Sequence, residues 1–479
     1  MKLRKICMGA VLLLSLAACG NNNNDALYEE TNLEDFVFQT EFIDHYSPSW
    51  NVASTFWGHF IDMEFETAFE MMSEHMQTAL GGYETLGGIY NSIVMSAGDF
   101  TESSAHIEIV ASEEDADMLD IIAFHTTAIS IYRLVVAPSG EIEGFWLVDT
   151  EFLAMAREGA TYSAEPIVLG AGSYWPLDGL LTVPEGASAE NPVPAVVLVH
   201  GSGSTAGDMD SSIFNNRPFF DIADYLSSNG IAVIRYHKRT FSHAAQLMQQ
   251  YSNNLTVWQE TVEDAVFAAD FLRNDPRIDN DKIFMLGLSM GGMLAPRIHT
   301  SGGDFAGMII AGATPQRFTD LIIEQSLASV EAIADEEIRE GAMAQIAEMA
   351  ELFDSLQNMT AEEAQAIPFD GGATFYYLRD FNAYPFEELV QDIDVPFLVL
   401  HGTRDFQTPA HISVPAFREA IGYRANVTII VYDDLNHMLM PSVATSMAGI
   451  FEDYARDGNV SPLVLEDIVT WINLFGGQN

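Results

Sequence analysis

The residues with the clearest chemical potential in this sequence are a serine, an aspartate and a histidine, in that order along the chain. Ser289 is the centre of Gly287–Gly291, which reads G-x-S-x-G. A strand is predicted before this segment and a helix after it, which places Ser289 at a strand–turn–helix corner. Small flanking residues let the neighbouring backbone approach closely and leave the serine hydroxyl exposed. This context, more than the pentapeptide itself, predicts a nucleophile.

A serine hydroxyl is a poor nucleophile unless a base lies within hydrogen-bond reach. His437 follows the last predicted strand, where such a base is expected. Asp405 follows the preceding predicted strand, and its carboxylate would orient the imidazole and stabilise the charged form. We therefore predict Ser289, His437 and Asp405 as nucleophile, base and acid.

Three other residues compete for the roles of acid and base. Asp433 and Asp434 lie close to His437 in the sequence, but their short tether favours exposed surface positions. His411 is an alternative base, although it is predicted to open a helix near Asp405. These alternatives can be separated only by the geometry of the folded chain.

A glycine-rich segment, His200–Ser204 (HGSGS), ends another predicted strand. A developing oxyanion needs hydrogen-bond donors that are fixed before the reaction begins. We predict the backbone N–H of Ser202 as one donor and the N–H of Met290, directly after the nucleophile, as the other. His200 is predicted to hold the loop.

Short apolar runs that alternate with helical patterns must position these residues. Such alternation, with nearly all-apolar strands, predicts a parallel sheet covered by helices on both faces. The predicted strands span residues 195–200, 231–236, 283–288, 308–311, 397–401 and 427–432, with helices at 219–228, 257–273 and 290–299.

A long helical segment at about residues 314–394 interrupts this alternation. Thr360 and Glu363 form a helix-start signal within it. An insertion of this length in an α/β sheet is usually functional. We predict a cap over Ser289; the alternative is a helical pair that only buries its own apolar stripe.

A separate small α+β domain is predicted for residues 48–160. Residues 53–76 carry apolar side chains at helical spacing, and a run of predicted strands follows. No group of residues there suggests chemistry, so a spacer or binding role is expected. Its predicted strands span residues 106–111, 119–126, 128–137 and 144–148.

Residues 1–18 have the pattern of a secretory signal: a basic start (MKLRK) precedes an apolar run too short to span a bilayer. Leu16–Cys19 (LAAC) resembles a bacterial lipobox, in which the cysteine thiol receives a diacylglyceryl group before cleavage. We therefore predict lipidation at Cys19, a flexible tether over residues 19–47 and a lipid-anchored protein on the extracytoplasmic face of the cell membrane. An ordinary signal peptide is the alternative.

The composition limits the classes of partner. The chain has 479 residues, enough for two or three domains, and carries 20 basic against 69 acidic residues, a net charge of −49. So negative a surface would repel phosphate backbones, which argues strongly against nucleic-acid binding. No set of His, Cys and carboxylate residues has metal-ligand spacing, so neither a metal nor an organic cofactor is expected. The sequence leaves the oligomeric state open.

Residues 163–479 resemble the α/β-hydrolase superfamily, and more narrowly bacterial serine esterases of the dienelactone-hydrolase and prolyl-oligopeptidase-like branch. Related enzymes usually carry an aspartate and a glycine around the motif that reads RYHKR at 235–239 in this chain, where His237 and Thr240 stand instead. This departure bears on specificity. The small domain more weakly resembles nuclear-transport-factor-like modules of bacterial lipoproteins. The shared motifs are HGSGS at 200–204, RYHKR at 235–239, GLSMG at 287–291, HGTRD at 401–405 and NH at 436–437.

The resemblance implies an α/β-hydrolase fold and a serine hydrolase that needs no cofactor. The expected activity is that of a carboxylesterase, which cleaves short-chain acyl esters through an acyl-enzyme. A serine peptidase or aminoacyl hydrolase of the same fold is an alternative, but that branch usually adds a propeller with repeats of roughly 40–50 residues, and no such repeat is visible. A non-catalytic binding lipoprotein on this scaffold would show a lost triad residue, whereas all three candidates are present.

Overall fold

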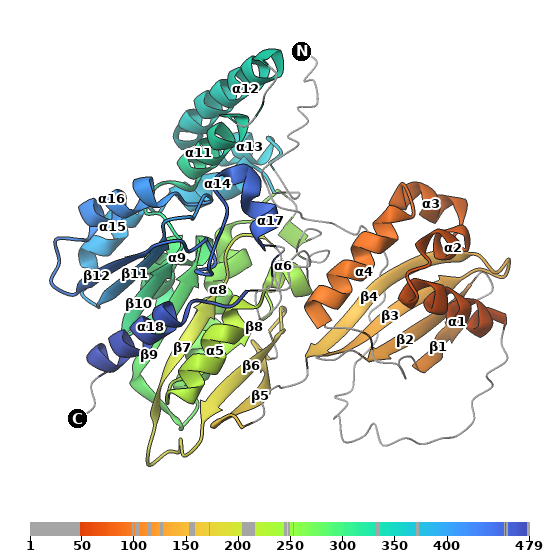
Figure 1. Cartoon of the computed structure of the whole chain (residues 1–479), viewed down its shortest axis with the longest axis horizontal. Helices are drawn as coiled ribbons and strands as arrows, with labels where there is room; N and C mark the ends of the chain where they lie inside the picture. The colour runs from red at the N-terminus through yellow and green to blue at the C-terminus, as the bar shows by residue number, and fades with distance from the viewer. Residues whose placement is uncertain are drawn as a thin grey trace. The chain divides into compact units, whose positions relative to one another are not determined.

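The computed structural model divides the chain into two compact units, which meet in sequence at Leu153 and Ala154 (Figure 1). The predicted signal, Cys19 and the predicted tether lie outside the residues that the structure describes. No helix among the described residues is long and apolar enough to cross a membrane. The structure describes residues 48–97, 100, 106–112, 116–124, 128–152, 159–171, 173–203, 216–243, 247, 250–251, 253–331, 333, 336–369, 373–454, 456 and 458–476.

The first unit is a four-stranded antiparallel sheet, in the order β1-β2-β3-β4, packed against helices α1–α4. Its core is aromatic: Trp57 of α1 packs against Tyr132 of β3, and Phe56 and Phe60 of α1 pack against Phe145 of β4. The prediction of a small α+β domain is confirmed. The helices are α1 Pro48–Ile61, α2 Phe65–Glu70, α3 Glu74–Leu80 and α4 Glu84–Ala97; the strands are β1 His106–Ser112, β2 Asp117–Phe124, β3 Ala128–Val136 and β4 Ile142–Phe152.

The helical spacing over residues 53–76 predicts one helix, and this prediction is wrong because the segment forms parts of three helices, α1, α2 and α3. The backbone leaves the helical conformation at Met63, whose φ is 60°. A new helix, α3, then begins after Ser73, whose hydroxyl accepts the N–H of Met76. The apolar spacing continues across three helices because all three contribute side chains to the same apolar core.

The second unit is built on an eight-stranded sheet in the order β12-β11-β10-β9-β7-β8-β6-β5. Six neighbouring strands pair in parallel, in the order β8, β7, β9, β10, β11 and β12 across the sheet. Strand β6 runs antiparallel to both β8 and β5. The strands are β5 Tyr162–Leu169, β6 Leu177–Pro184, β7 Val193–Val199, β8 Ala232–Tyr236, β9 Ile278–Leu288, β10 Gly307–Ala311, β11 Phe397–Gly402 and β12 Val427–Tyr432.

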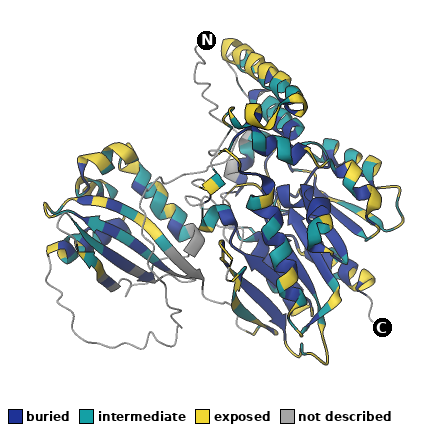
Figure 2. Ribbon diagram, turned by 180° about the vertical axis from the view of Figure 1, so that it is seen from behind, coloured by how far each residue is buried: buried dark blue, intermediate teal, exposed yellow. Residues whose placement is uncertain are grey.

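Helices cover both faces of this sheet, and the strands between them are buried (Figure 2). On one face, α5 (Pro218–Ser228) and α18 (Pro462–Phe475) bury apolar side chains such as Phe219 and Trp471. On the other face, α8 (Glu263–Arg273) and α10 (Ala295–Ile298) do the same. The predicted α/β-hydrolase fold, with its mostly parallel sheet, is confirmed.

A helical segment joins β10 to β11. The helix-start signal at Thr360 is confirmed, because its hydroxyl accepts the N–H of Glu363 while the Glu363 carboxylate accepts the N–H of Thr360. In Figure 1, α11–α14 lie at the same end of the sheet as α9. The elements are α11 Phe318–Glu331, α12 Glu336–Ser355, η4 Leu356–Asn358, α13 Ala361–Gln365, α14 Phe375–Asn382, α15 Phe386–Leu389 and η6 Val390–Asp392.

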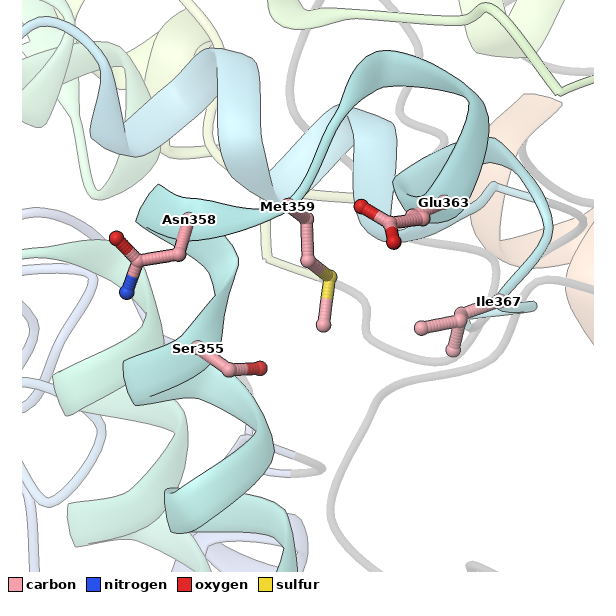
Figure 3. Close-up of a pocket in the computed structure, with 5 residues that line it drawn as sticks. All are labelled: Ser355, Asn358, Met359, Glu363 and Ile367. Carbon is pink, nitrogen blue, oxygen red and sulfur yellow. The ribbon is translucent and has the colours of Figure 1, made fainter.

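This segment packs on the body of the unit and also has a hollow of its own. Arg297 of α10 makes a two-point ion pair with Asp380 of α14, at 2.9 and 3.1 Å. The hollow, of about 350 Å³, lies between the end of α12 and α13 and contains none of the predicted triad residues (Figure 3). Its lining residues are Ser355, Asn358, Met359, Glu363 and Ile367.

Candidate active site

Ser289 lies between β9 and α9 (Met290–Met293) in a backbone conformation that is rare for a residue with a side chain, with φ 55° and ψ −120°. Both glycines of the motif are required by close approach. A Cβ at Gly287 would lie 2.4 Å from the carbonyl carbon of Gly291, and a Cβ at Gly291 would lie 2.5 Å from the oxygen of Val199. The sequence therefore folds into a sharp turn that leaves the Ser289 side chain half-exposed.

Asp405 and His437 meet across the ends of two neighbouring strands. Nδ1 of His437 lies 2.9 Å from Oδ2 of Asp405, and both residues are buried. Asp405 is held by its own loop, because Oδ1 accepts the N–H groups of Gln407 and Thr408 at 2.9 and 2.8 Å. The Thr408 hydroxyl donates to Oδ2 at 2.7 Å. The carboxylate is thus fixed on both oxygens and can orient the imidazole.

The charge state of Asp405 follows from these contacts. Burial alone would raise its pKa, but the interactions with His437, with the neighbouring His401 and with the N–H of Thr408 outweigh burial and hold the pKa of Asp405 below its usual range. The carboxyl group is therefore ionised at neutral pH. In this state it accepts hydrogen bonds only, as the acid of a triad must.

The backbone of β10 brings Ser289 next to this pair. The N–H of Ser289 donates to the carbonyl of Ala311 at 2.9 Å. The next residue, Gly312, lies against the pair: a Cβ built there would be 3.3 Å from Nδ1 of His437 and 3.4 Å from Oδ2 of Asp405. Ser289 and the Asp405–His437 pair therefore lie on either side of the end of β10, at the carboxyl ends of β9 and of β11 and β12.

The two predicted oxyanion donors belong to segments that adjoin Ser289. Met290 begins α9, so its N–H has no acceptor within the helix. On the other side, the loop after β7 contacts Ser289 directly, because a Cβ at Gly201 would lie 3.1 Å from the Ser289 Cβ. Ser202 follows and is exposed. An arrangement of this kind can stabilise negative charge on an oxygen bound to the carbon that Ser289 attacks.

The sequence profile of the family described as serine aminopeptidase, S33, matches residues 190–442, more than half of the chain. This range contains strands β7 to β12, the elbow and all three triad candidates. The chain belongs to the α/β-hydrolase superfamily. The prediction of a hydrolytic enzyme is confirmed by this match, and the esterase relative described next confirms a carboxylic ester hydrolase.

Similarity to one relative extends over nearly the whole hydrolase. Esterase EstD of Thermotoga maritima is 30% identical over 419 residues, which are 86% of this chain and 93% of the relative. Among solved structures, Est1E from Butyrivibrio proteoclasticus covers 64% of this chain and 98% of its own at 15% identity and a TM-score of 0.39. An esterase of Pyrococcus furiosus covers 67% and 95% at 12% identity and a TM-score of 0.40. These two similarities concern the fold alone.

The alternatives for acid and base in this hydrolase are occupied elsewhere or exposed. Asp434 pairs with Nε of Arg404 at 2.6 Å. Asp433 is exposed, and His411 is an exposed residue at the start of α16 (Ala410–Ala420). Neither competing carboxylate contacts the imidazole that Asp405 holds.

Sequence reasoning missed several residues that hold the site. Asn436 fixes the histidine loop: its side-chain oxygen accepts the N–H groups of Met438 and Met440 at 3.0 and 3.1 Å. Thr408, which donates hydrogen bonds to both oxygens of Asp405, is a second residue that was missed. Its position three residues after Asp405 is a signal that could have identified it. His200 behaves as predicted, because its Nε2 lies 2.6 Å from the carbonyl oxygen of Tyr236. No group of residues that could hold a metal ion is found in the described part of the chain.

Proposed function

We propose that this hydrolase is a serine esterase in which Ser289, His437 and Asp405 form the triad. The observation that carries the proposal is the strained elbow of Ser289 beside an Asp405–His437 pair whose atoms lie 2.9 Å apart. The Ser289 Oγ attacks the ester carbonyl carbon while His437 accepts its proton. The carbonyl π electrons move to the oxygen and give a tetrahedral oxyanion.

The N–H groups of Met290 and Ser202 are proposed to bind this oxyanion. When the tetrahedral intermediate collapses, the carbon–oxygen bond to the alcohol breaks and His437 returns the proton to the leaving alcohol. A water molecule then attacks the acyl-enzyme, with His437 as base, and releases the carboxylic acid. Asp405 remains ionised throughout and stabilises the imidazolium.

An ester is favoured over an aminoacyl amide by the state of the buried carboxylates. An aminopeptidase needs an anion to bind the α-ammonium group of its substrate. Three buried carboxylates lie near the reacting groups, and all are engaged: Asp405 by His437, Glu260 by Lys238 and Asp453 by the side chain of Asn436. We expect purified enzyme to cleave p-nitrophenyl acetate far faster than aminoacyl p-nitroanilides. Faster cleavage of the anilides would favour the aminopeptidase alternative.

The helices between β10 and β11 are proposed to act as a cap that limits the size of the acyl group. In support, Phe375 and Tyr377 of α14 belong to the same apolar core as Met290, directly after the nucleophile. We expect acetyl and butyryl esters to be preferred over long-chain esters. Replacing residues 336–365 by a short glycine–serine linker should shift this chain-length profile, measured as kcat/KM on a p-nitrophenyl ester series.

Labelling by a fluorophosphonate controls for the integrity of the site in this experiment. The linker variant should retain labelling at Ser289 within a few-fold of the wild-type rate. If the chain-length profile is unchanged, the segment only buries its own apolar stripe and specificity lies elsewhere.

We also propose that the mature enzyme is anchored to the extracytoplasmic face of the cell membrane through Cys19. The LAAC sequence and the basic, then apolar residues before it support this proposal. Cys19→Ser should abolish the acyl mass at the mature N-terminus and leave either soluble protein or uncleaved precursor. Intact-mass measurement of the membrane fraction tests it. A mature N-terminus elsewhere, without lipid, would contradict the lipobox.

A further inference from the structure

The second shared motif, RYHKR, places a lysine inside the molecule. Lys238 has a side-chain exposure of 2% and ion-pairs with Glu260, a residue of the π-helical turn η2 (Trp258–Val262). Its ammonium group also donates to the carbonyl oxygens of Gly201 and Gly203, at 2.8 and 2.9 Å. A buried ammonium group is costly, and an apolar pair of similar volume would often stabilise a fold equally well. The position of its partners therefore indicates a task beyond stability.

The two carbonyl groups that Lys238 binds lie on either side of Ser202. The carbonyl of Gly201 and the N–H of Ser202 belong to the same peptide group. Because that group is planar and trans, its N–H points opposite to its carbonyl. When Lys238 fixes the Gly201 carbonyl, it also fixes the direction of the Ser202 N–H.

The side chain of Met290, the residue that carries the other proposed donor, is connected to the same ion pair. The second carboxylate oxygen of Glu260 accepts the Tyr377 hydroxyl at 2.5 Å, and that hydroxyl lies 3.5 Å from the sulfur of Met290. Burial, followed by the charge and hydrogen bond of Glu260, raises the pKa of Tyr377 well above its usual range, so the hydroxyl keeps its proton and donates it. The chain of contacts runs from the glycine loop through Lys238, Glu260 and Tyr377 to Met290.

We propose that Lys238 is a positioning residue of the oxyanion hole, which fixes the Gly201–Ser202 peptide so that its N–H faces the oxygen of the reacting carbonyl. Glu260 and Tyr377 hold the lysine and connect it to the Met290 side of the hole. The proposal rests on the proposed esterase function. It assigns to the RYHKR motif a role in stabilising the transition state; the Thr240 hydroxyl also donates to the Gly203 carbonyl, at 3.4 Å.

The test replaces the ammonium group and measures transition-state binding separately from substrate binding. Lys238→Met should lower kcat for p-nitrophenyl acetate roughly tenfold to hundredfold, less than removal of a donor itself, with KM changed by less than about twofold. A trifluoromethyl ketone, which adds the serine oxygen and forms a bound oxyanion, should inhibit more weakly by the same factor. Lys282→Met, at a half-buried lysine outside the site that pairs with Asp279 at 3.1 Å, is the matched control and should leave all three constants unchanged.

A second variant guards against a simple folding defect. Lys238→Met leaves the Glu260 carboxylate buried without its cation, whereas Lys238→Met combined with Glu260→Gln removes both charges. We expect the double variant to fold with a wild-type circular dichroism spectrum and still to show the parallel loss of kcat and ketone affinity. Wild-type kcat and ketone affinity in this variant would overturn the proposal. So would a loss of kcat with unchanged ketone affinity.

Failure of the proposed esterase function can be distinguished from failure of the positioning role of Lys238. If wild-type enzyme does not cleave the ester, or if Ser289→Ala cleaves it equally well, the esterase mechanism fails before Lys238 is tested. If both of those controls behave as expected and only the Lys238 variants retain full ketone affinity, the positioning role alone fails.

Discussion

Ser289→Ala is expected to lower kcat for p-nitrophenyl acetate by about 10⁵-fold to 10⁶-fold, to the residual rate that binding and the oxyanion donors alone provide. The reason is that the acyl-enzyme needs a nucleophilic oxygen at the elbow. A methyl group there cannot form the bond, and the rigid turn offers no other hydroxyl at that position. Steady-state kinetics with protein freed of wild-type carry-over measures the effect.

A matched control replaces a serine outside the site. Ser163 is an exposed residue of the edge strand β5, and its hydroxyl lies 3.2 Å from Glu165. Ser163→Ala should therefore keep wild-type kcat and KM. If Ser289→Ala retains more than about a hundredth of the wild-type kcat, the nucleophile lies elsewhere.

His437→Ala should lose nearly as much activity as Ser289→Ala, and combining the two substitutions should cost little more, because triad residues act as a unit. Asp405→Asn should lower kcat by about 10⁴-fold, since an amide favours the wrong imidazole tautomer. Asp434→Asn removes a partner of Arg404 at the surface and should leave kcat unchanged. An inactive Asp434→Asn with an active Asp405→Asn would show that the acid is misplaced.

The pH dependence of the Asp405→Asn effect has a definite sign. The pKa of Asp405 is lowered, so the carboxylate contributes above the ordinary pKa of about 3.9 and its contribution is lost only as the pH falls through the lower folded value. The difference in free energy of unfolding between wild-type and Asp405→Asn, measured by urea titration, should therefore not shrink as the pH falls from 8 to about 4. A difference that shrinks between pH 7 and pH 5 would contradict an ionised Asp405.

The reacting residues could be predicted from the sequence because each follows an apolar strand. In a parallel sheet these strand ends share one edge, so the order of serine, aspartate and histidine along the chain already indicates their meeting point. Strands β5 and β6 were not predicted. Strand β5 is an edge strand with alternating exposure and contains Pro166, so it has no continuous apolar run.

The contacts that position the site could not be predicted from the sequence. Glu260 and Tyr377 are separated by 117 positions, and neither belongs to a motif that indicates a partner. A buried lysine has no local sequence signature, because lysine is most often exposed. Such pairings depend on how the segment between β10 and β11 packs, which strand and helix periodicity does not specify.

Transfer of an acyl group to the Ser289 oxygen is tested most directly by mass spectrometry of the labelled protein. Treated with a fluorophosphonate, the enzyme should gain one phosphonyl group, with loss of fluoride, on the peptide that contains Ser289. Prior incubation with an excess of a short-chain ester should slow this labelling, and His437→Ala should nearly abolish it. A phosphonyl group on any other residue, in a protein that still cleaves esters, would contradict the account.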